Sequence, residues 1–163
     1  MKTLIRNLCA LIMLSAAFTA QAQTDAPAGP VILTVTGPDG AEAMFDLDMM
    51  EALDQKVTVV ETPWYDGVQE FSGPLISDLM AHLDITGSEL SIVAANDYAA
   101  AVPWSDIEDY PVILATRHNG NTMSLRDKGP LFVIYPFDAH PELRNEVVFS
   151  RSVWQVKEVK VSP

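Results

Sequence analysis

Short segments rich in β-branched residues, most of them closed by a turn signal, recur along the chain from residue 31 to residue 161. Alternation of apolar and polar residues with a period of two is typical of half-buried strands. The strongest turn signals are Gly37-Pro38-Asp39-Gly40 and Asn119-Gly120-Asn121. This pattern predicts one α+β domain, mostly sheet, with a few short helices and no internal repeat. The expected strands are residues 31–36, 43–47, 57–61, 90–95, 99–102, 112–118, 131–135, 147–150 and 153–161.

One segment has the spacing of an amphipathic helix. Leu75, Leu79 and Leu83 lie on one face of such a helix, and Gly87 ends it. The other helical candidates are a short helix ending at Leu53 and capped by Asp46 or Asp48, a turn at residues 104–106 capped by Ser105, and a helix or turn at residues 141–145.

The N-terminal residues have the pattern of a secretory signal. Two basic residues precede an apolar run at residues 8–20, and Ala20-Gln21-Ala22 has the small-residue pattern of a cleavage site. We therefore expect a signal peptide over residues 1–22, a flexible lead-in over residues 23–30 and the folded domain over residues 31–161. The alternative is an uncleaved N-terminal anchor. An acidic exported chain of this kind is expected in the periplasm of a Gram-negative bacterium.

The only cysteine, Cys9, lies inside the expected signal peptide, with no lipobox before it. The mature chain would therefore contain no disulfide, no cysteine-ligated metal and no thiol nucleophile. All 22 acidic residues and eight of the ten basic residues follow residue 22, so its net charge is −14 with histidine neutral. Such a surface repels nucleic acid and anionic membranes, so neither is an expected partner.

Common catalytic motifs are missing from the sequence. His82, His118 and His140 show no metal-binding spacing, and no serine lies in a GxSxG elbow. The acids at positions 106, 108 and 109 are expected to form a solvated helix end rather than a pair of catalytic carboxylates. Neither a metal site nor a hydrolase is therefore predicted.

Polar and aromatic residues instead gather where expected strands end, in WYD at residues 64–66, NDY at 96–98, YPFD at 135–138 and SRSVWQ at 150–155. Aromatic faces can stack on a flat heteroaromatic ring, and carboxylate or amide groups can pair with its donor–acceptor edge. The alternative is that the aromatic residues belong to the core, with their polar tips satisfied at its edge.

The same residues carry a family resemblance. The ordered stretches GVQEFSGPLISDLM, ANDYAAAVPWSDI, VILATRHNGNTMSLRDKGPLFVIYPFD and SRSVWQVKEVKV together resemble the molybdopterin-binding domain of the sulfite oxidase fold, over roughly residues 31–161. In enzymes of that family a cysteine follows the strand that ends here at Val60-Glu61-Thr62, and its thiolate binds molybdenum. This chain has no cysteine there, and Glu61 or Thr62 would be a poor substitute for a soft thiolate.

The resemblance therefore implies the cysteine-lacking subset of the fold, in which small periplasmic proteins bind a reduced pterin. These proteins report the pterin to a membrane receptor, such as a diguanylate cyclase or phosphodiesterase, or a histidine kinase. Two alternatives remain open: a molybdopterin-dependent oxidoreductase with an oxygen ligand in place of the cysteine, and a ligand-free adaptor. Molybdenum is not expected.

The resemblance points most directly to Arg151 and Ser152, because the matching stretch of molybdenum-containing members faces the cofactor. Arg117 and Arg126 are weaker candidates, since either can be an ordinary charge at a sheet edge. The full set of expected ligand-binding residues is Trp64, Asp66, Asn96, Asp97, Tyr98, Tyr135, Asp138, Arg151, Ser152 and Trp154.

Overall fold

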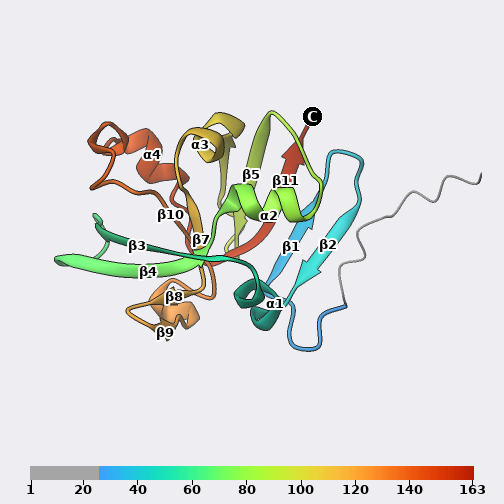
Figure 1. The fold of residues 1–163 in the computed structure, drawn as a ribbon, viewed down its shortest axis with the longest axis horizontal. Coiled ribbons are helices and arrows are strands. Elements are labelled where there is room, and N and C mark those ends of the chain that lie inside the picture. The colour runs from blue at the N-terminus through green and yellow to red at the C-terminus, as the bar shows by residue number, and fades with distance from the viewer. Residues whose placement is uncertain (1–25) are drawn as a thin grey trace, which may run out of the picture.

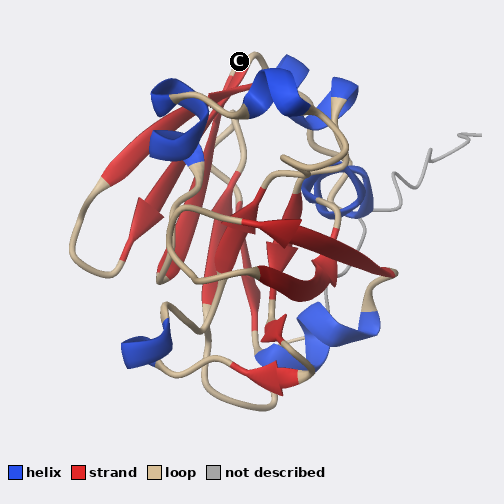
Figure 2. Ribbon diagram, turned by 90° about the vertical axis from the view of Figure 1, so that its left-hand side faces the viewer, coloured by secondary structure: helices blue, strands red, loops and turns tan. Residues whose placement is uncertain are grey.

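The fold is seen in a computed structural model that describes residues 26–163 (Figure 1). The expected signal peptide, with Cys9, lies outside the described residues. Among the helices of the described part, none has the length and apolar character needed to cross a bilayer. The helices lie around the outside of the strands, which form the centre of the molecule (Figure 2).

The largest sheet has five strands, in which the first and last strands of the chain are parallel neighbours and all other pairs are antiparallel. Val35 lies opposite Val159 in the parallel pair, and both side chains are buried. The expected hairpin around residues 37–40 is confirmed. In spatial order the strands are β2 (Glu42–Phe45), β1 (Leu33–Thr36), β11 (Val156–Ser162), β5 (Glu89–Ala94) and β6 (Ala99–Pro103).

Two smaller sheets complete the β-structure. One has the order β3 (Gln55–Glu61), β4 (Val68–Pro74), β8 (Arg117–His118) and β9 (Asn121–Thr122), and the other pairs β10 (Phe132–Ile134) with β7 (Ile113–Ala115). The expected hairpin at residues 119–121 joins β8 to β9. Two expectations were incomplete: residues 112–118 divide between two sheets, and β4 was not predicted because EFSG interrupts its alternation.

The first and second helices follow the sequence signals. Asp46 caps α1 (Leu47–Ala52) by accepting the Met49 N–H at 2.9 Å. The same carboxylate accepts the N–H groups of Ala28 and Gly29, each at 2.8 Å, and so attaches the lead-in to the domain. Helix α2 (Ile76–His82) buries Leu79 at the expected position, but it ends with Leu83 as its C-terminal cap and not at Gly87.

Two local expectations were wrong. Residues 147–150 belong to helix α4 (Glu146–Arg151), because the Asn145 side chain accepts the Val148 N–H at 3.1 Å and begins a helix despite the valines. Helix α3 (Trp104–Asp109) begins directly after Pro103, so Ser105 lies inside it and is not its cap. The expected turn at residues 141–145 is a 3-10 helix, Pro141–Leu143, and a second one covers Leu125–Asp127.

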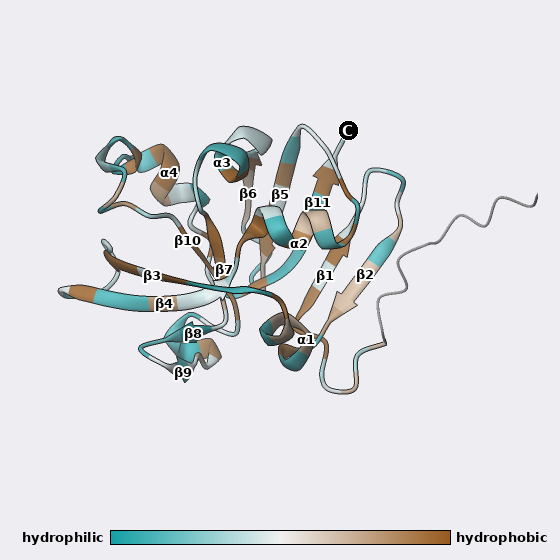
Figure 3. Cartoon of the chain, in the orientation of Figure 1, coloured by the Kyte–Doolittle hydropathy of each residue, from teal (hydrophilic) through white to brown (hydrophobic). Residues whose placement is uncertain are grey.

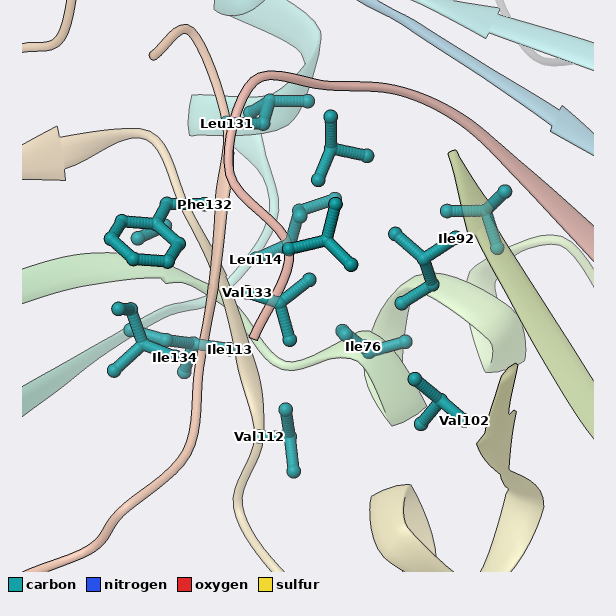
Figure 4. Packing of buried hydrophobic residues seen from close by; sticks show 14 of the residues in the cluster. Ile76, Ile92, Val102, Val112, Ile113, Leu114, Leu131, Phe132, Val133 and Ile134 are labelled. Carbon is teal, nitrogen blue, oxygen red and sulfur yellow. The ribbon is translucent and has the colours of Figure 1, made fainter. Parts of the chain in front are cut away.

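The core lies where β7 and β10 pass between the other sheets. Every residue of these two strands is buried, as expected for strands covered on both faces (Figure 4). β7 is accordingly coloured as hydrophobic, whereas β8, which continues the same segment, is hydrophilic (Figure 3). Gly73 lets β4 approach β7 closely, since a Cβ at this position would lie 2.2 Å from the Leu114 carbonyl oxygen.

Candidate ligand-binding site

A cavity of about 360 Å³ opens between three segments that are distant in the sequence. They are the loop after β3, the turn between β5 and β6, and α4 with the residues that follow it. The volume falls in the range of about 300–1,000 Å³ that is typical of small-molecule sites. The lining residues are Trp64, Ala94, Asn96, Tyr98, Glu146, Phe149, Ser150, Ser152, Val153 and Trp154.

Trp64 is the centre of the aromatic part of the cavity. Its ring centroid lies 6.1 Å from Trp154 and 6.1 Å from Phe149, in both cases edge to face. On its inner side it packs at 5.4 Å against Phe132 of the core. Trp154 stays 38% exposed, so the cavity has one anchored indole and one at its mouth. Trp64 and Trp154, both expected to bind a ligand, therefore lie in one site.

The turn between β5 and β6 is bonded to α4 across the cavity. The Tyr98 hydroxyl donates to the Ser150 carbonyl oxygen at 2.9 Å, and the Asn96 side-chain oxygen accepts the Tyr98 N–H at 3.1 Å. Asp97 reaches the tight turn between them with a φ of +65°, a conformation that Asp tolerates well. These bonds position Asn96 and Tyr98 at the rim.

Glu146, the Asn96 amide and the indole N–H groups of Trp64 and Trp154 are polar groups of the lining that can meet a ligand, although the Asn96 oxygen also accepts the Tyr98 N–H. The two serine hydroxyls are already used within α4: Ser150 donates to the Val147 carbonyl oxygen, and the buried Ser152 donates to that of Val148. Among the described residues that line the cavity there is no lysine or arginine. The site therefore combines aromatic faces with an acceptor carboxylate and an amide.

Arg151 lies beside the cavity in a buried polar cluster. Its guanidinium donates to the Asp106 carboxylate at 2.9 Å, and the Tyr135 hydroxyl donates to the same oxygen at 2.7 Å. Burial, reinforced by Asp106, raises the pKa of Tyr135. The cluster joins α3, the end of β10 and α4, and so holds the helix that lines the cavity. The expectation of a solvated Asp106 was wrong, because α3 turns this carboxylate inward.

Three other predicted residues lie outside the cavity. Asp66 is exposed, and Asp97 forms an ion pair with Lys157 at 2.6 Å, which lowers the pKa of the Asp97 carboxyl. Asp138 accepts the Glu61 N–H at 3.0 Å and pairs with Arg144. The structure thus brings Trp64, Asn96, Tyr98, Ser152 and Trp154 together, and leaves Asp66, Asp97, Tyr135, Asp138 and Arg151 out of the lining.

Tyr65 points to a different place from its neighbour Trp64. Its ring lies 4.5 Å from His118, and the Lys128 ammonium lies 4.2 Å above it. His118 stacks on Phe71 at 4.7 Å, and burial, with a smaller contribution from Lys128, lowers the pKa of His118. These residues fasten the loop after β3 to β4 and β8, which fixes Trp64 in the cavity wall.

Sequence reasoning missed five lining residues, Ala94, Ser150, Val153, Glu146 and Phe149, of which the last two carry an acidic and an aromatic side chain. Both lie on α4, which the valines at positions 147 and 148 had suggested to be a strand. The signal that could have found them is Asn145, since asparagine followed by glutamate is typical of a helix start.

The residues at the end of β3 do not suit molybdenum. Thr62 is buried, and its hydroxyl has no hydrogen-bond partner among the described residues, whereas Glu61 is exposed. Neither offers the soft thiolate that molybdenum takes in the enzymes that the sequence resembles. The described part of the chain also contains no cluster of three or more His, Cys, Asp or Glu side chains.

Fold and cavity together define a single α+β domain with a small aromatic site, which confirms the fold class expected from the sequence. The structure is similar to that of the sulfane dehydrogenase SoxCD from Paracoccus pantotrophus, with a TM-score of 0.62 and 17% identity. The match covers 80% of this chain but only 37% of that chain. No protein-family model matches the chain, and no curated protein is similar to it. At this identity the likeness shows a shared fold alone.

Proposed function

We propose that the protein is a non-catalytic pterin-binding module of the periplasm. In this proposal it takes up a reduced pterin and reports it to a membrane receptor with a cyclic-di-GMP or histidine kinase output. The observation that carries the proposal is the cavity of about 360 Å³ between Trp64, Tyr98 and Trp154. A flat bicyclic ring can stack on such faces, as other heteroaromatic rings do.

The polar groups of the lining support a pterin in particular. Its 2-amino group is a donor, which the Glu146 carboxylate can accept, and the Asn96 amide can both donate and accept. Because these two side chains lie on different segments, the ring would bridge α4 and the turn between β5 and β6. Binding would then stabilise that pair of elements, and this change would signal that the site is occupied.

The charge of the site favours a pterin without a phosphate. Arg151 and Lys157 are close to the lining residues in the sequence. Both are already engaged in ion pairs, Arg151 with Asp106 and Lys157 with Asp97. Anion recognition normally uses arginine or lysine donors. The lining offers Glu146 instead, which would repel a phosphate. A free reduced pterin therefore fits the site better than a molybdopterin, which carries a phosphate.

Calorimetric titration with a reduced pterin, tetrahydromonapterin or dihydrobiopterin, tests the proposal. We expect saturable binding of one ligand per chain. Trp154→Ala removes a stacking face and is expected to weaken binding by about 5- to 150-fold, the effect of losing about 1–3 kcal/mol. Trp104→Ala is the matched control, because Trp104 lies outside the cavity lining. No binding at millimolar pterin would reject the proposal.

The two alternatives make different predictions. An oxidoreductase with an oxygen ligand would contain molybdenum when it is purified from its own host, which elemental analysis measures. A ligand-free adaptor would bind no pterin, and its tryptophan variants would change stability alone. We expect a pterin-binding protein without stoichiometric molybdenum.

A further inference from the structure

Strand β3 is the longest unprotected sheet edge among the described residues. It pairs with β4 on one side and with no described strand on the other. The edges of the five-stranded sheet are short or blocked: β2 has four residues and begins with Glu42, and β6 ends at Pro103. β3 has seven residues, and its centre, Val57-Thr58-Val59-Val60, contains no charge and no proline. Such an edge is a ready template for another strand.

The hydrogen bonds of Glu61 show which backbone groups face the open side. Its N–H donates to Asp138 at 3.0 Å, and its carbonyl oxygen accepts from Arg144 at 3.4 Å, so both groups point away from β4. Outward-facing residues alternate along an antiparallel strand, so Val59 and Val57 present their N–H and carbonyl groups to the same open side. Asp138 and Arg144 cover the last position and leave these two free for pairing.

Three exposed valines lie on the outer face beside this edge. Val57 is 52% exposed and Val59 57% exposed, and Val68, which lies opposite Glu61 on β4, is 57% exposed. Residues directly opposite each other in an antiparallel pair lie on the same face of the sheet. The three valines therefore share one face of the sheet next to an unpaired ladder, together with the exposed Glu61 and Glu70. Strands β3 and β4 run side by side as one long ribbon (Figure 1).

We propose that β3 pairs antiparallel with β3 of a second copy of this chain, with the two-fold axis at Thr58. In this register Val57 lies opposite Val59 of the second copy. By symmetry, Val59 lies opposite Val57 of the second copy. Thr58 meets Thr58 of the second copy on the inner face, which is a favourable cross-strand pair. The ladder ends at these valine pairs, because Asp138 and Arg144 cover Glu61, and no two like charges oppose each other within it.

Neighbouring registers are less complementary. A shift by one residue would bring exposed side chains against buried ones, since side chains alternate between the faces. A shift that puts Val59 opposite Val59 of the second copy would place Val57 opposite the carboxylate of Glu61. The sequence of β3 thus matches its own reverse best around Thr58, and this self-complementarity favours a second copy over an unrelated strand.

Sedimentation equilibrium of the purified protein over a range of concentrations tests the pairing. We expect the average mass to rise toward twice the monomer mass as concentration increases. Val59→Lys places a charge in the ladder and is expected to hold the mass at the monomer value. Val31→Lys is the control for an added charge, because Val31 is also exposed but lies outside β3. A wild-type protein that stays monomeric at millimolar concentration would overturn the proposal and leave the edge to a different partner.

Cysteine cross-linking in a Cys9→Ser background tests the register. Thr58 faces its counterpart as a non-hydrogen-bonded pair, with Cα atoms about 4.5 Å apart, which suits a disulfide. Thr58→Cys is therefore expected to give a disulfide-linked dimer on mild oxidation. Val57→Cys should give no disulfide. In this register the Val57 Cα atoms of the two copies are offset by two residues along the strand and by one strand spacing across it, which puts them about 8 Å apart. Efficient cross-linking of Val57→Cys with none of Thr58→Cys would contradict the register.

Discussion

Asp106 accepts two hydrogen bonds in the interior, one from the Tyr135 hydroxyl and one from the Arg151 guanidinium. Tyr135→Phe removes the first bond and leaves the carboxylate less well satisfied. We expect the free energy of unfolding to fall by about 1–3 kcal/mol, the usual effect of a lost buried bond to a charged group. Urea unfolding measures the change. Tyr110→Phe is the control, with a much smaller expected effect, because Tyr110 is only partly buried.

Tyr98 offers a second test at the scale of one atom. Its hydroxyl bonds to the Ser150 carbonyl oxygen and so ties one wall of the cavity to the other. Tyr98→Phe keeps the ring and removes this bond. We expect pterin affinity to fall by about three- to tenfold, with little change in unfolding temperature, because the ring is 48% exposed. Equal affinity of variant and wild type would show that the bond does not organise the site.

At the scale of elements, the contact between β4 and β7 depends on Gly73. A methyl group at this position would collide with the Leu114 carbonyl oxygen, so Gly73→Ala must push the two strands apart. We expect a loss of about 1–3 kcal/mol in the free energy of unfolding, measured by urea denaturation. Gly29→Ala is the matched control. Its new Cβ would lie 3.5 Å from the nearest atom, an ordinary contact, and its effect should be small.

The start of α1 gives the protein an acid-sensitive contact. Four backbone N–H groups, led by those of Met49 and Gly29, lower the pKa of Asp46 below its usual value of 3.8. Because the folded-state pKa is depressed, this contribution is fully present above about pH 4 and is lost as the pH falls through the folded pKa. Asp46→Asn should therefore flatten the fall of stability below pH 4. Asp48→Asn is the control, because Asp48 is an exposed acid two residues further along the chain. This control should leave the fall of stability below pH 4 unchanged.

The elements that sequence reasoning found have strong local signals, and the others depend on distant contacts. The hairpin at residues 37–40 and the cap at Asp46 follow from turn and cap residues alone. Strand β4 could not be read in the same way, because its alternation breaks at Ser72 and Gly73 and its place is set by β3, β8 and β7. Helix α4 was misread because β-branched residues suggest a strand wherever the cap is overlooked.

At the scale of the whole molecule, the sequence identified half of the cavity lining and misplaced the charged residues. Trp64, Tyr98 and Trp154 were found because large aromatics beside turns are conspicuous. Whether Arg151 meets a ligand or a carboxylate depends on Asp106, which lies 45 residues away in the chain. The sequence pattern around Arg151 therefore does not predict its ion pair with Asp106. The fold itself followed from the order of several motifs, and the likeness to SoxCD supports it.

The proposed function requires that the cavity between Trp64, Tyr98 and Trp154 binds a pterin ring. A crystal structure of the protein with dihydrobiopterin tests it most directly. We predict ring density stacked against Trp154, with the amino edge of the pterin within hydrogen-bond distance of Glu146. A structure with saturating pterin that shows the ring elsewhere, or shows this cavity filled by side chains alone, would contradict the account.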